Sequence, residues 1–239
     1  LDSGTSKVHS VLKDNAGNLW IAIYQKGVMM IPAQPNSFKY IGYKSINKNI
    51  IGSNCITSLC RDHEGILWIG TDNDGIYGIT TELKQKVHYA PHDSPSSVPS
   101  TVFGLYEDSE HNLWFGSYTN GLGRLDKKTG QCSYLQNLTD KNGNRIQRVY
   151  DLVEDQDKRL WIATMGAGLF YYDLKTGQSV YDPKFNAATK KYKWISCLLY
   201  AGDNHLYVGT YDGIRCIDLS TDDFKTEEIL SRHIIHSLY

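Results

Sequence analysis

Residues 56–76 read ITSLCRDHEGILWIGTDNDGI, and variants of this phrase return along the whole chain of 239 residues. Its Leu-Trp-Ile-Gly core recurs at a nearly constant interval, because successive aromatic anchors are 48, 46, 47 and 46 residues apart. The anchors are Trp20, Trp68, Trp114, Trp161 and Tyr207. A regular interval of this length is typical of an array of similar supersecondary units, so the repeat predicts the fold before any single residue is interpreted.

Each unit is built from short runs that have the character of β-strands. The runs are rich in Val, Ile, Tyr and Trp, and turns of Asp, Asn and Gly separate them. No window shows sustained apolar residues at helical spacing. Four short strands in a unit of this length are typical of a β-propeller blade, whereas a β-sandwich, the commonest alternative, does not repeat one phrase five times.

We therefore predict an all-β chain that forms a single β-propeller segment over residues 1–239, with five complete four-stranded blades and the first strand of a sixth. The blades are expected at about 8–40, 56–89, 102–135, 149–181 and 195–227, and the next blade at 234–239. The chain is interpreted as a partial array of a larger propeller, and a closed five-bladed ring with one surplus strand is the alternative. A partial array would expose apolar blade faces, so we expect self-association.

The repeated residues have predictable mechanical roles. Trp68 and Gly70 lie on the same face of a strand because side chains alternate, so the ring is expected to fill the gap between blades and the glycine to let the next sheet approach. The carboxylates of Asp14 and Asp62 are expected to accept nearby backbone N–H groups in tight turns that end at a glycine. The final strand of the fifth unit is expected at about 224–227.

Composition excludes several classes of protein. The chain has 25 basic and 26 acidic residues and a net charge of -1, which argues against a nucleic-acid partner. No apolar stretch approaches the length of a membrane span. The five cysteines show no metal or disulfide spacing and are expected to be unpaired thiols. The eight histidines are scattered without metal spacing, so we expect no metal and no cofactor.

In this tandem form, the phrase at residues 56–76 resembles the two-component-regulator propeller repeat, which builds the periplasmic sensor region of hybrid two-component systems in Bacteroides-type bacteria. The resemblance covers the whole chain. It implies a propeller that is usually seven-bladed and is followed by an immunoglobulin-like domain, a membrane span and a histidine kinase, none of which we find in this segment. It also implies a periplasmic location, sensing of oligosaccharides released from polysaccharides, and membrane contact only through those other parts.

A ligand is expected where loops differ from blade to blade. The loops between the second and third strands, and those between blades, should gather on one face around the central opening, where aromatic and polar side chains suit a sugar. The candidate ligand-binding residues are Tyr24, Lys26, Asp72, Asn73, Tyr118, Asn120, Arg148, Trp194, Tyr211 and Asp212. Trp194 is the sharpest candidate because it is the one Trp outside the anchor positions, and the alternative for it is packing against the start of the fifth blade.

Three functions compete at this stage. The first is a non-catalytic sensory or binding module that recognises an oligosaccharide. The second is a propeller enzyme acting on carbohydrate, a lyase or glycosidase, for which Asp72, Asp74 and Asp212 are available carboxylates without a marked pairing. The third is a passive scaffold for protein contacts. We predict no catalytic residue in the segment.

Overall fold

The structure is a computed structural model, and it describes residues 8–23, 27–34, 41, 51–53, 55–80, 85–140, 142–181, 194–221 and 224–238. Within these residues the regular secondary structure is entirely β, which confirms the predicted fold class. None of the segments described is a helix that is long and apolar enough to cross a membrane.

Five antiparallel sheets follow one another along the chain, and we call them blades 1 to 5. Blade 1 is formed by β1 (Val8–Lys13), β2 (Leu19–Ile23) and β3 (Gly27–Ile31). Blade 2 is formed by β4 (Ile56–Arg61), β5 (Leu67–Thr71), β6 (Ile76–Ile79) and β7 (Gln85–Tyr89). Blade 3 is formed by β8 (Val102–Glu107), β9 (Leu113–Ser117), β10 (Leu122–Leu125) and β11 (Cys132–Tyr134).

The last two sheets repeat this arrangement. Blade 4 is formed by β12 (Val149–Glu154), β13 (Arg159–Thr164), β14 (Leu169–Asp173) and β15 (Gln178–Val180). Blade 5 is formed by β16 (Ile195–Tyr200), β17 (His205–Thr210), β18 (Gly213–Asp218) and β19 (Thr226–Ser231). In blades 2 to 5 each strand pairs with its neighbour in sequence, so every blade is a simple four-stranded meander.

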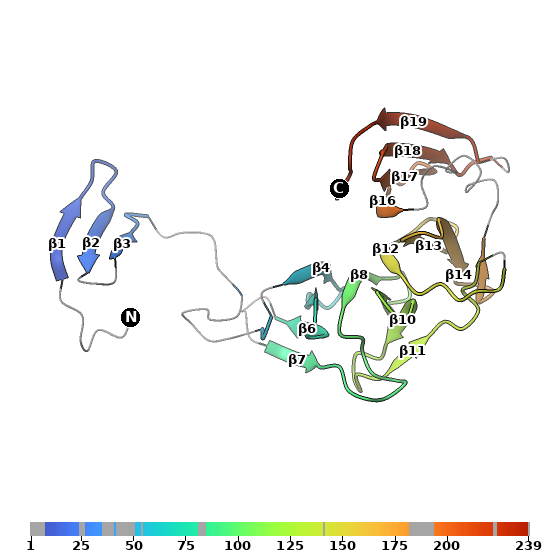
Figure 1. Ribbon diagram of the computed structural model, residues 1–239, viewed down its shortest axis with the longest axis horizontal. Helices are drawn as coiled ribbons and strands as arrows, with labels where there is room; N and C mark the ends of the chain where they lie inside the picture. The colour runs from blue at the N-terminus through green and yellow to red at the C-terminus, as the bar shows by residue number, and fades with distance from the viewer. Residues whose placement is uncertain are drawn as a thin grey trace. The chain divides into compact units, whose positions relative to one another are not determined.

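The chain divides into two compact units, Leu1–Ile50 with blade 1 and Ile51–Tyr239 with blades 2 to 5 (Figure 1). That all of residues 1–239 form one propeller segment stays a prediction. The fourth strand expected near residues 38–40 lies outside the described residues.

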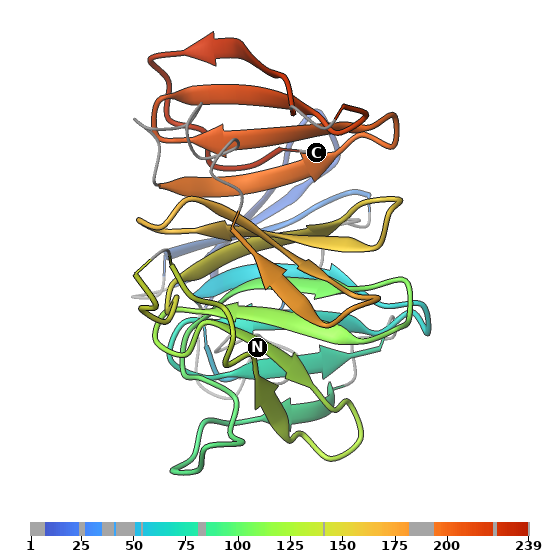
Figure 2. The ribbon, with the colours of Figure 1, turned by 90° about the vertical axis from the view of Figure 1, so that its right-hand side faces the viewer.

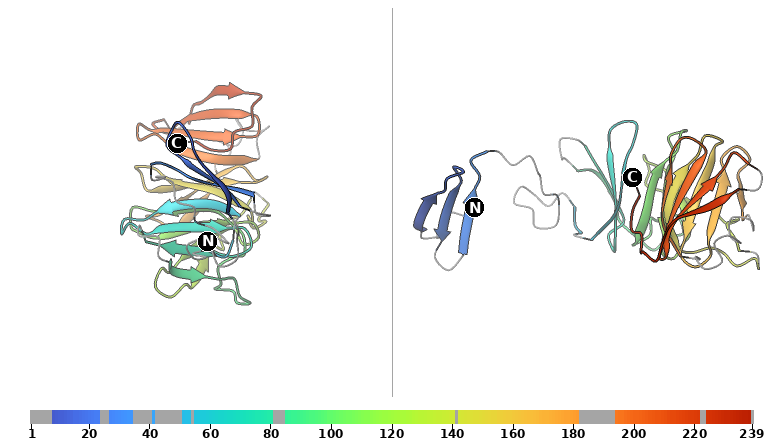
Figure 3. Two further views of the ribbon diagram at one scale, coloured as in Figure 1. Left: turned by 90° about the vertical axis from the view of Figure 1, so that its left-hand side faces the viewer. Right: turned by 90° about the horizontal axis from the view of Figure 1, so that it is seen from above.

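Blades 2 to 5 stand side by side in the second unit, as Figures 2 and 3 show. Their first strands contact one another in series, β4 with β8, β8 with β12 and β12 with β16, so they form the inner side of the array. Each hydrophobic cluster joins two neighbouring blades: one lies between blades 2 and 3, one between 3 and 4, and one between 4 and 5. This is propeller architecture, because the core lies between blades rather than inside one sheet.

A buried indole anchors each of these junctions. Trp68, Trp114 and Trp161 are 2%, 3% and 0% exposed, so the predicted wedge role of the repeated tryptophan is confirmed in blades 2 to 4. The repeated glycine has its predicted role as well, because a Cβ atom at Gly116 would lie 2.5 Å from the Val149 carbonyl oxygen and one at Gly70 would lie 3.0 Å from the Val102 side chain, on the first strand of the next blade.

The turn aspartates do more than hold their turns. The carboxylates of Asp14 and Asp62 accept backbone N–H groups in their turns, as predicted. In blade 4 one carboxylate oxygen of Asp155 likewise accepts the backbone N–H groups of Asp157 and Arg159, and the other accepts the Trp161 indole N–H at 2.7 Å. The same pairing joins Asp14 to Trp20, Asp62 to Trp68 and Asp108 to Trp114. In blade 1 the Trp20 hydrogen bond is the main cause that lowers the pKa of Asp14 to about 2. A buried indole N–H needs an acceptor, so the turn aspartate also stabilises the buried tryptophan of its own blade.

The fifth blade differs from the prediction at its end. Its last strand runs over Thr226–Ser231 instead of about 224–227, because Phe224 at φ 45° still belongs to the turn after residue 221. Residues 233–238 are not in a strand, yet the Ile235 N–H donates to the Thr210 carbonyl, and Ile235 packs where a side chain at Gly209 would stand. This contact reproduces the way that blade 3 meets Gly70 of blade 2.

Candidate functional site

In blades 2 to 5, the loops after the second strands, which were expected to carry a site, lie on one face of the second unit. In each of blades 2 to 5 the first residue of the first strand pairs with the last residue of the second, as Ile56 does with Thr71 and Ile195 with Thr210. The loop after the second strand therefore lies next to the start of the first strand. We call this end of blades 2 to 5 the upper face and the opposite end, with the turns after the first strands, the lower face.

In blades 2 to 5 a β-bulge at the start of the first strand directs one side chain into a shared groove. The register shifts between the first and third residues of β4, β8, β12 and β16, so the second residue is the extra one. These second residues are Thr57, Phe103, Tyr150 and Ser196. Bulges often re-aim side chains beside functional sites, and all four line one groove.

Two aromatic groups occupy the upper, central part of the array. Phe103 stacks on Tyr150 at 4.3 Å between ring centroids and meets Tyr118 edge-on at 6.0 Å. The Arg148 guanidinium lies 4.9 Å from the Tyr118 ring centroid. In the second group, Trp194 and Tyr211 meet edge to face at 5.6 Å.

The groove between these groups has a volume of about 340 Å³ and is lined by the first strands of blades 2 to 5 and by residues 236–238. Tyr150 and Tyr211 both line it. Burial raises the pKa of the Tyr150 phenol, and the neighbouring Tyr211 and Tyr118 raise it further. Tyr118, Trp194 and Tyr211 remain 42%, 47% and 45% exposed, so their rings are available to a molecule in solution. We call Phe103, Tyr118, Arg148, Tyr150, Trp194 and Tyr211 the aromatic cluster.

One buried carboxylate also lines the groove. Asp151 accepts the backbone N–H of Leu152 within its own strand and that of Leu198 across the junction with blade 5. Burial nevertheless raises the pKa of Asp151 to about 6. The groove thus combines aromatic rings with several polar side chains, among them a carboxyl group, Asp151, whose charge changes near neutral pH.

Four of the ten predicted residues enter this cluster, namely Tyr118, Arg148, Trp194 and Tyr211. Trp194 is half exposed beside Tyr211, although its backbone also bridges to Met165. Tyr24 and Lys26 lie outside the described residues.

The four remaining predicted residues make contacts within or between the loops of the upper face. Asp72 accepts the Thr101 hydroxyl at 2.7 Å, which ties the blade 2 loop to the start of blade 3. Asn73 has φ 81°, and together with Asp72 it lines a separate open depression. The backbone of Asn120 receives the Arg145 guanidinium, and the backbone of Asp212 bonds Thr210 and Arg232. These contacts do not bring the four residues into the groove.

Two members of the cluster, Phe103 and Tyr150, were missed by sequence reasoning. The signal was present, because the second residue of each first strand varies from Thr57 to Phe103, Tyr150 and Ser196 inside an otherwise repeated phrase. Simple alternation cannot say that this position faces the centre, since it depends on the bulge.

Blades with a buried indole wedge and a variable aromatic centre define a β-propeller repeat protein with an accessible central groove. Residues 50–73, 96–119 and 143–166 match the family described as "Two component regulator propeller". Each match runs from before a first strand to just after a second strand, in blades 2, 3 and 4. These three segments are therefore similar to the two-component regulator propeller repeat, which agrees with the predicted resemblance. A search of curated proteins found no match.

Solved structures show the same fold. The extracellular domains described for two hybrid two component systems of B. thetaiotaomicron, BT3049 and BT4673, are each 20% identical to the chain, with TM-scores of 0.55 and 0.54. They match 96% and 93% of this chain, which spans 35% and 36% of theirs. PorZ, a surface component of the type-IX secretion system of Porphyromonas gingivalis, is 14% identical over 97% of this chain and 40% of its own, with a TM-score of 0.53. At these identities the likeness concerns the fold alone.

Proposed function

We propose that this chain is a non-catalytic, ligand-sensing segment of a hybrid two-component system, and that its aromatic cluster binds an oligosaccharide derived from a polysaccharide. The repeat match supports the sensor region, since the matched family is named for two-component regulators. The extracellular origin of two structural neighbours supports a periplasmic location. The parent protein would then be a histidine kinase, and the membrane would be reached through its other parts.

The observation that carries the ligand proposal is the exposed aromatic surface around a groove. Sugar rings present flat C–H faces that pack on aromatic rings, and their hydroxyls need polar partners at the edges. Tyr118 and Trp194 offer half-exposed rings that contact Phe103 and Tyr211, and these two residues line a groove of about 340 Å³. Asp151 is a polar group within the groove, and Arg148 lies beside the Tyr118 ring. That volume lies at the lower end of the range for ligand sites, so it suits one or two sugar units rather than a long chain.

The hydrogen bonds of the candidate carboxylates argue against a catalytic carboxylate pair. Asp72 is occupied by Thr101, and Asp74 by the Tyr77 hydroxyl. Neither lines the central groove, in which Asp151 is the one carboxylate among the described lining residues. Acid–base cleavage of a glycosidic bond ordinarily uses two carboxyl groups on either side of it, so we favour a binding role.

The proposal is tested by calorimetric titration of oligosaccharide libraries into the chain and two variants, Tyr118→Ala and Trp194→Ala. Both rings are exposed, so their removal should leave the fold intact while affinity for one sugar class falls at least about tenfold, as expected when a ring that carries about 1.5 kcal/mol is lost.

Asn73→Gly is the matched control. It lies on the same face but outside the cluster, and its φ of 81° suits glycine, so affinity should not change. Binding that Asn73→Gly abolishes would move the site to the loops. Silence toward every sugar would favour a protein scaffold, and release of new reducing ends would favour an enzyme.

Self-association belongs to the same proposal. Leu59 on the inner strand of blade 2 is 61% exposed, and Ile229 and Ile234 at the blade 5 end are 52% and 56% exposed. Such apolar surface favours contact with another copy. Sedimentation velocity should therefore show a dimer or larger species, and a concentration-independent monomer would refute this part.

A further inference from the structure

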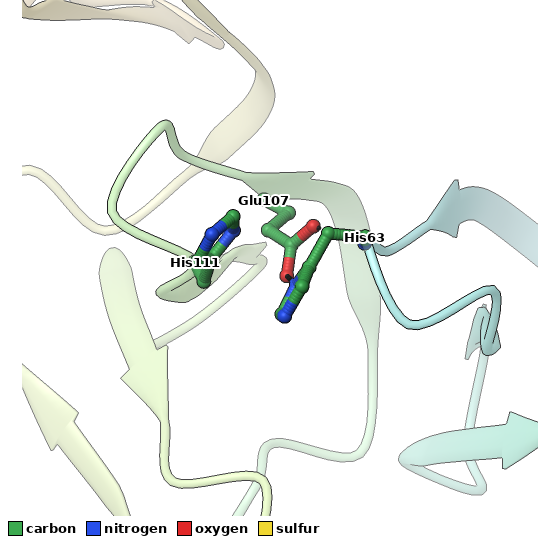
Figure 4. Close-up of side chains that lie close together, drawn as sticks. All are labelled: His63, Glu107 and His111. Carbon is green, nitrogen blue, oxygen red and sulfur yellow. Dashed lines mark hydrogen bonds and ion pairs between the residues drawn. The ribbon is translucent and has the colours of Figure 1, made fainter.

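A histidine and carboxylate group lies on the lower face, where it plays no part in the aromatic cluster. His63 belongs to the turn after β4, Glu107 ends β8, and His111 belongs to the turn after β8 (Figure 4). One ligand atom from each of the three lies within 4.8 Å of the others. Among the described residues this is the one group of three that could hold a metal ion.

The contacts within the group are close. His63 Nδ1 is 2.8 Å from Glu107 Oε1, and the His63 backbone N–H donates to Glu107 Oε2 at 2.7 Å. The two imidazole rings are stacked at 3.7 Å between centroids, with 23° between their planes. The three side chains therefore join blades 2 and 3 at a point where both histidines remain exposed to solvent.

The same three positions recur at the next junction with different residues. Ser109, Glu154 and Lys158 correspond to His63, Glu107 and His111, and there the Ser109 backbone and hydroxyl donate to Glu154 while Lys158 pairs with it at 3.4 Å. His111 and Lys158 share a left-handed backbone, with φ of 67° and 69°. The framework is thus repeated, and only at the junction of blades 2 and 3 does it present two imidazoles beside the carboxylate.

The local charge allows a cation. Asp62 and Glu107 supply two carboxylates, and Lys127 contacts both as the one ammonium group in this network. The Glu107 carboxylate accepts hydrogen bonds from Lys127 and from the backbone of His63, and its Oε1 atom contacts the His63 ring, so it is held in place. The neighbouring cavity beside His111 is also lined by Arg124 and Lys128, whose positive charges oppose a cation, and by Asp126, whose negative charge favours one.

We propose that His63, Glu107 and His111 bind one divalent first-row transition-metal ion of the zinc class, which clamps blade 2 to blade 3. Two imidazoles and a carboxylate are a common donor set for such ions, with bonds of about 2.0–2.2 Å and an open fourth position for water. Donor atoms around a tetrahedral ion are about 3.3 Å apart. The two exposed imidazole rings must therefore unstack and rotate, so that their nitrogen atoms shift by about an ångström. His63 Nδ1 exchanges its hydrogen bond to Glu107 Oε1 for the shared ion, and its ring proton moves to the outer nitrogen. The Lys127 ammonium, which contacts the same Oε1 atom, gives that place to the ion and keeps its ion pair with Asp62.

The test is titration of the whole chain with zinc chloride under reducing conditions, followed by calorimetry and by thermal unfolding. We expect one ion per chain and a raised unfolding temperature, because an ion that binds only the folded state stabilises it. The double variant H63S/H111K copies the residues of the next junction, so it should fold normally and lose the bound ion.

The reverse exchange makes the test sharper. The double variant S109H/K158H places two imidazoles beside Glu154 and should raise the stoichiometry from one zinc ion to two. Cobalt(II) in place of zinc distinguishes the ligands, since thiolate ligation by the free cysteines would give a sulfur-to-cobalt charge-transfer band that nitrogen and oxygen ligands lack. No zinc binding by the parent chain, binding retained in H63S/H111K, or a thiolate band would each overturn the proposal.

Discussion

Blades 4 and 5 follow the same meander but differ at three equivalent positions. Blade 4 has Asp155 under a fully buried Trp161, whereas blade 5 has Ala201 and a half-buried Tyr207 at the equivalent positions. The carboxylate and the indole are absent together from blade 5. The difference teaches that the aspartate is kept for the indole N–H as much as for the turn, because a buried donor without an acceptor costs about 1–3 kcal/mol.

The third difference lies on the inner strands. Asp151 of blade 4 faces the groove, and the equivalent residue in blade 5 is Cys197. Blade 4 thus carries a carboxylate that burial makes costly to ionise, where blade 5 carries a thiol. The third residue of the first strand is therefore not fixed by the repeat, and its chemistry differs between the two blades.

The largest expected effect comes from removing the blade 4 wedge. Trp161→Ala should lower the free energy of unfolding of the second unit by about 3–5 kcal/mol, since a buried ring is replaced by a cavity at the junction with blade 5. Tyr207→Ala in blade 5 is the matched variant and should cost clearly less. Denaturant unfolding measures both, and equal losses would remove the distinction between the two blades.

A smaller effect should depend on pH. Because burial raises the folded-state pKa of Asp151 from 3.8 to about 6, the folded protein favours the protonated form. Its stabilising contribution is therefore complete below about pH 4 and is lost as the pH rises through about 6, to an extent on the order of 2 kcal/mol. Asp151→Asn, which cannot ionise, should remove this component.

The comparison is made by measuring the unfolding free energy of the parent chain and of Asp151→Asn between pH 4 and pH 7.5. The parent should lose stability relative to the variant as the pH rises, and the other titrating groups cancel in the difference. A difference that is constant over this range would mean that Asp151 is ionised in the groove without cost.

The smallest effect is the coupling between carboxylate and indole. A double-mutant cycle of Asp155→Ala and Trp161→Tyr converts blade 4 to the residue pair of blade 5, and the two losses should be less than additive by about 1 kcal/mol, the worth of a buried hydrogen bond. Strict additivity would show that the two residues are lost from blade 5 for unrelated reasons.

The repeat allowed much of the fold to be predicted. The strands of blades 2 to 4, the wedge at Trp68, the close approach at Gly70 and the turn role of Asp62 all follow from alternation and turn chemistry, which are local properties. The end of blade 5 was misplaced because its turn extends through Phe224, whose left-handed backbone has no clear signal in the sequence.

The aromatic cluster was predicted less completely, and its role in binding stays a prediction. Tyr118, Arg148, Trp194 and Tyr211 were chosen from the sequence because variable loop residues stand out against a repeat. Phe103 and Tyr150 were not, because a bulge turns them toward the centre. His63 and His111 are 48 residues apart and lie in two turns, so no spacing rule could connect them.

The sequence alone was enough to predict the class of fold, the order of the four strands in blades 2 to 5, and the buried anchors Trp68, Trp114 and Trp161, since these depend on periodicity and on hydrophobic pattern within about 46 residues. Only the tertiary structure decided which polar and aromatic residues meet. Neighbouring blades place equivalent positions side by side, and the contacts Phe103–Tyr150 and His63–His111 arise from that stacking, which joins residues about one repeat apart.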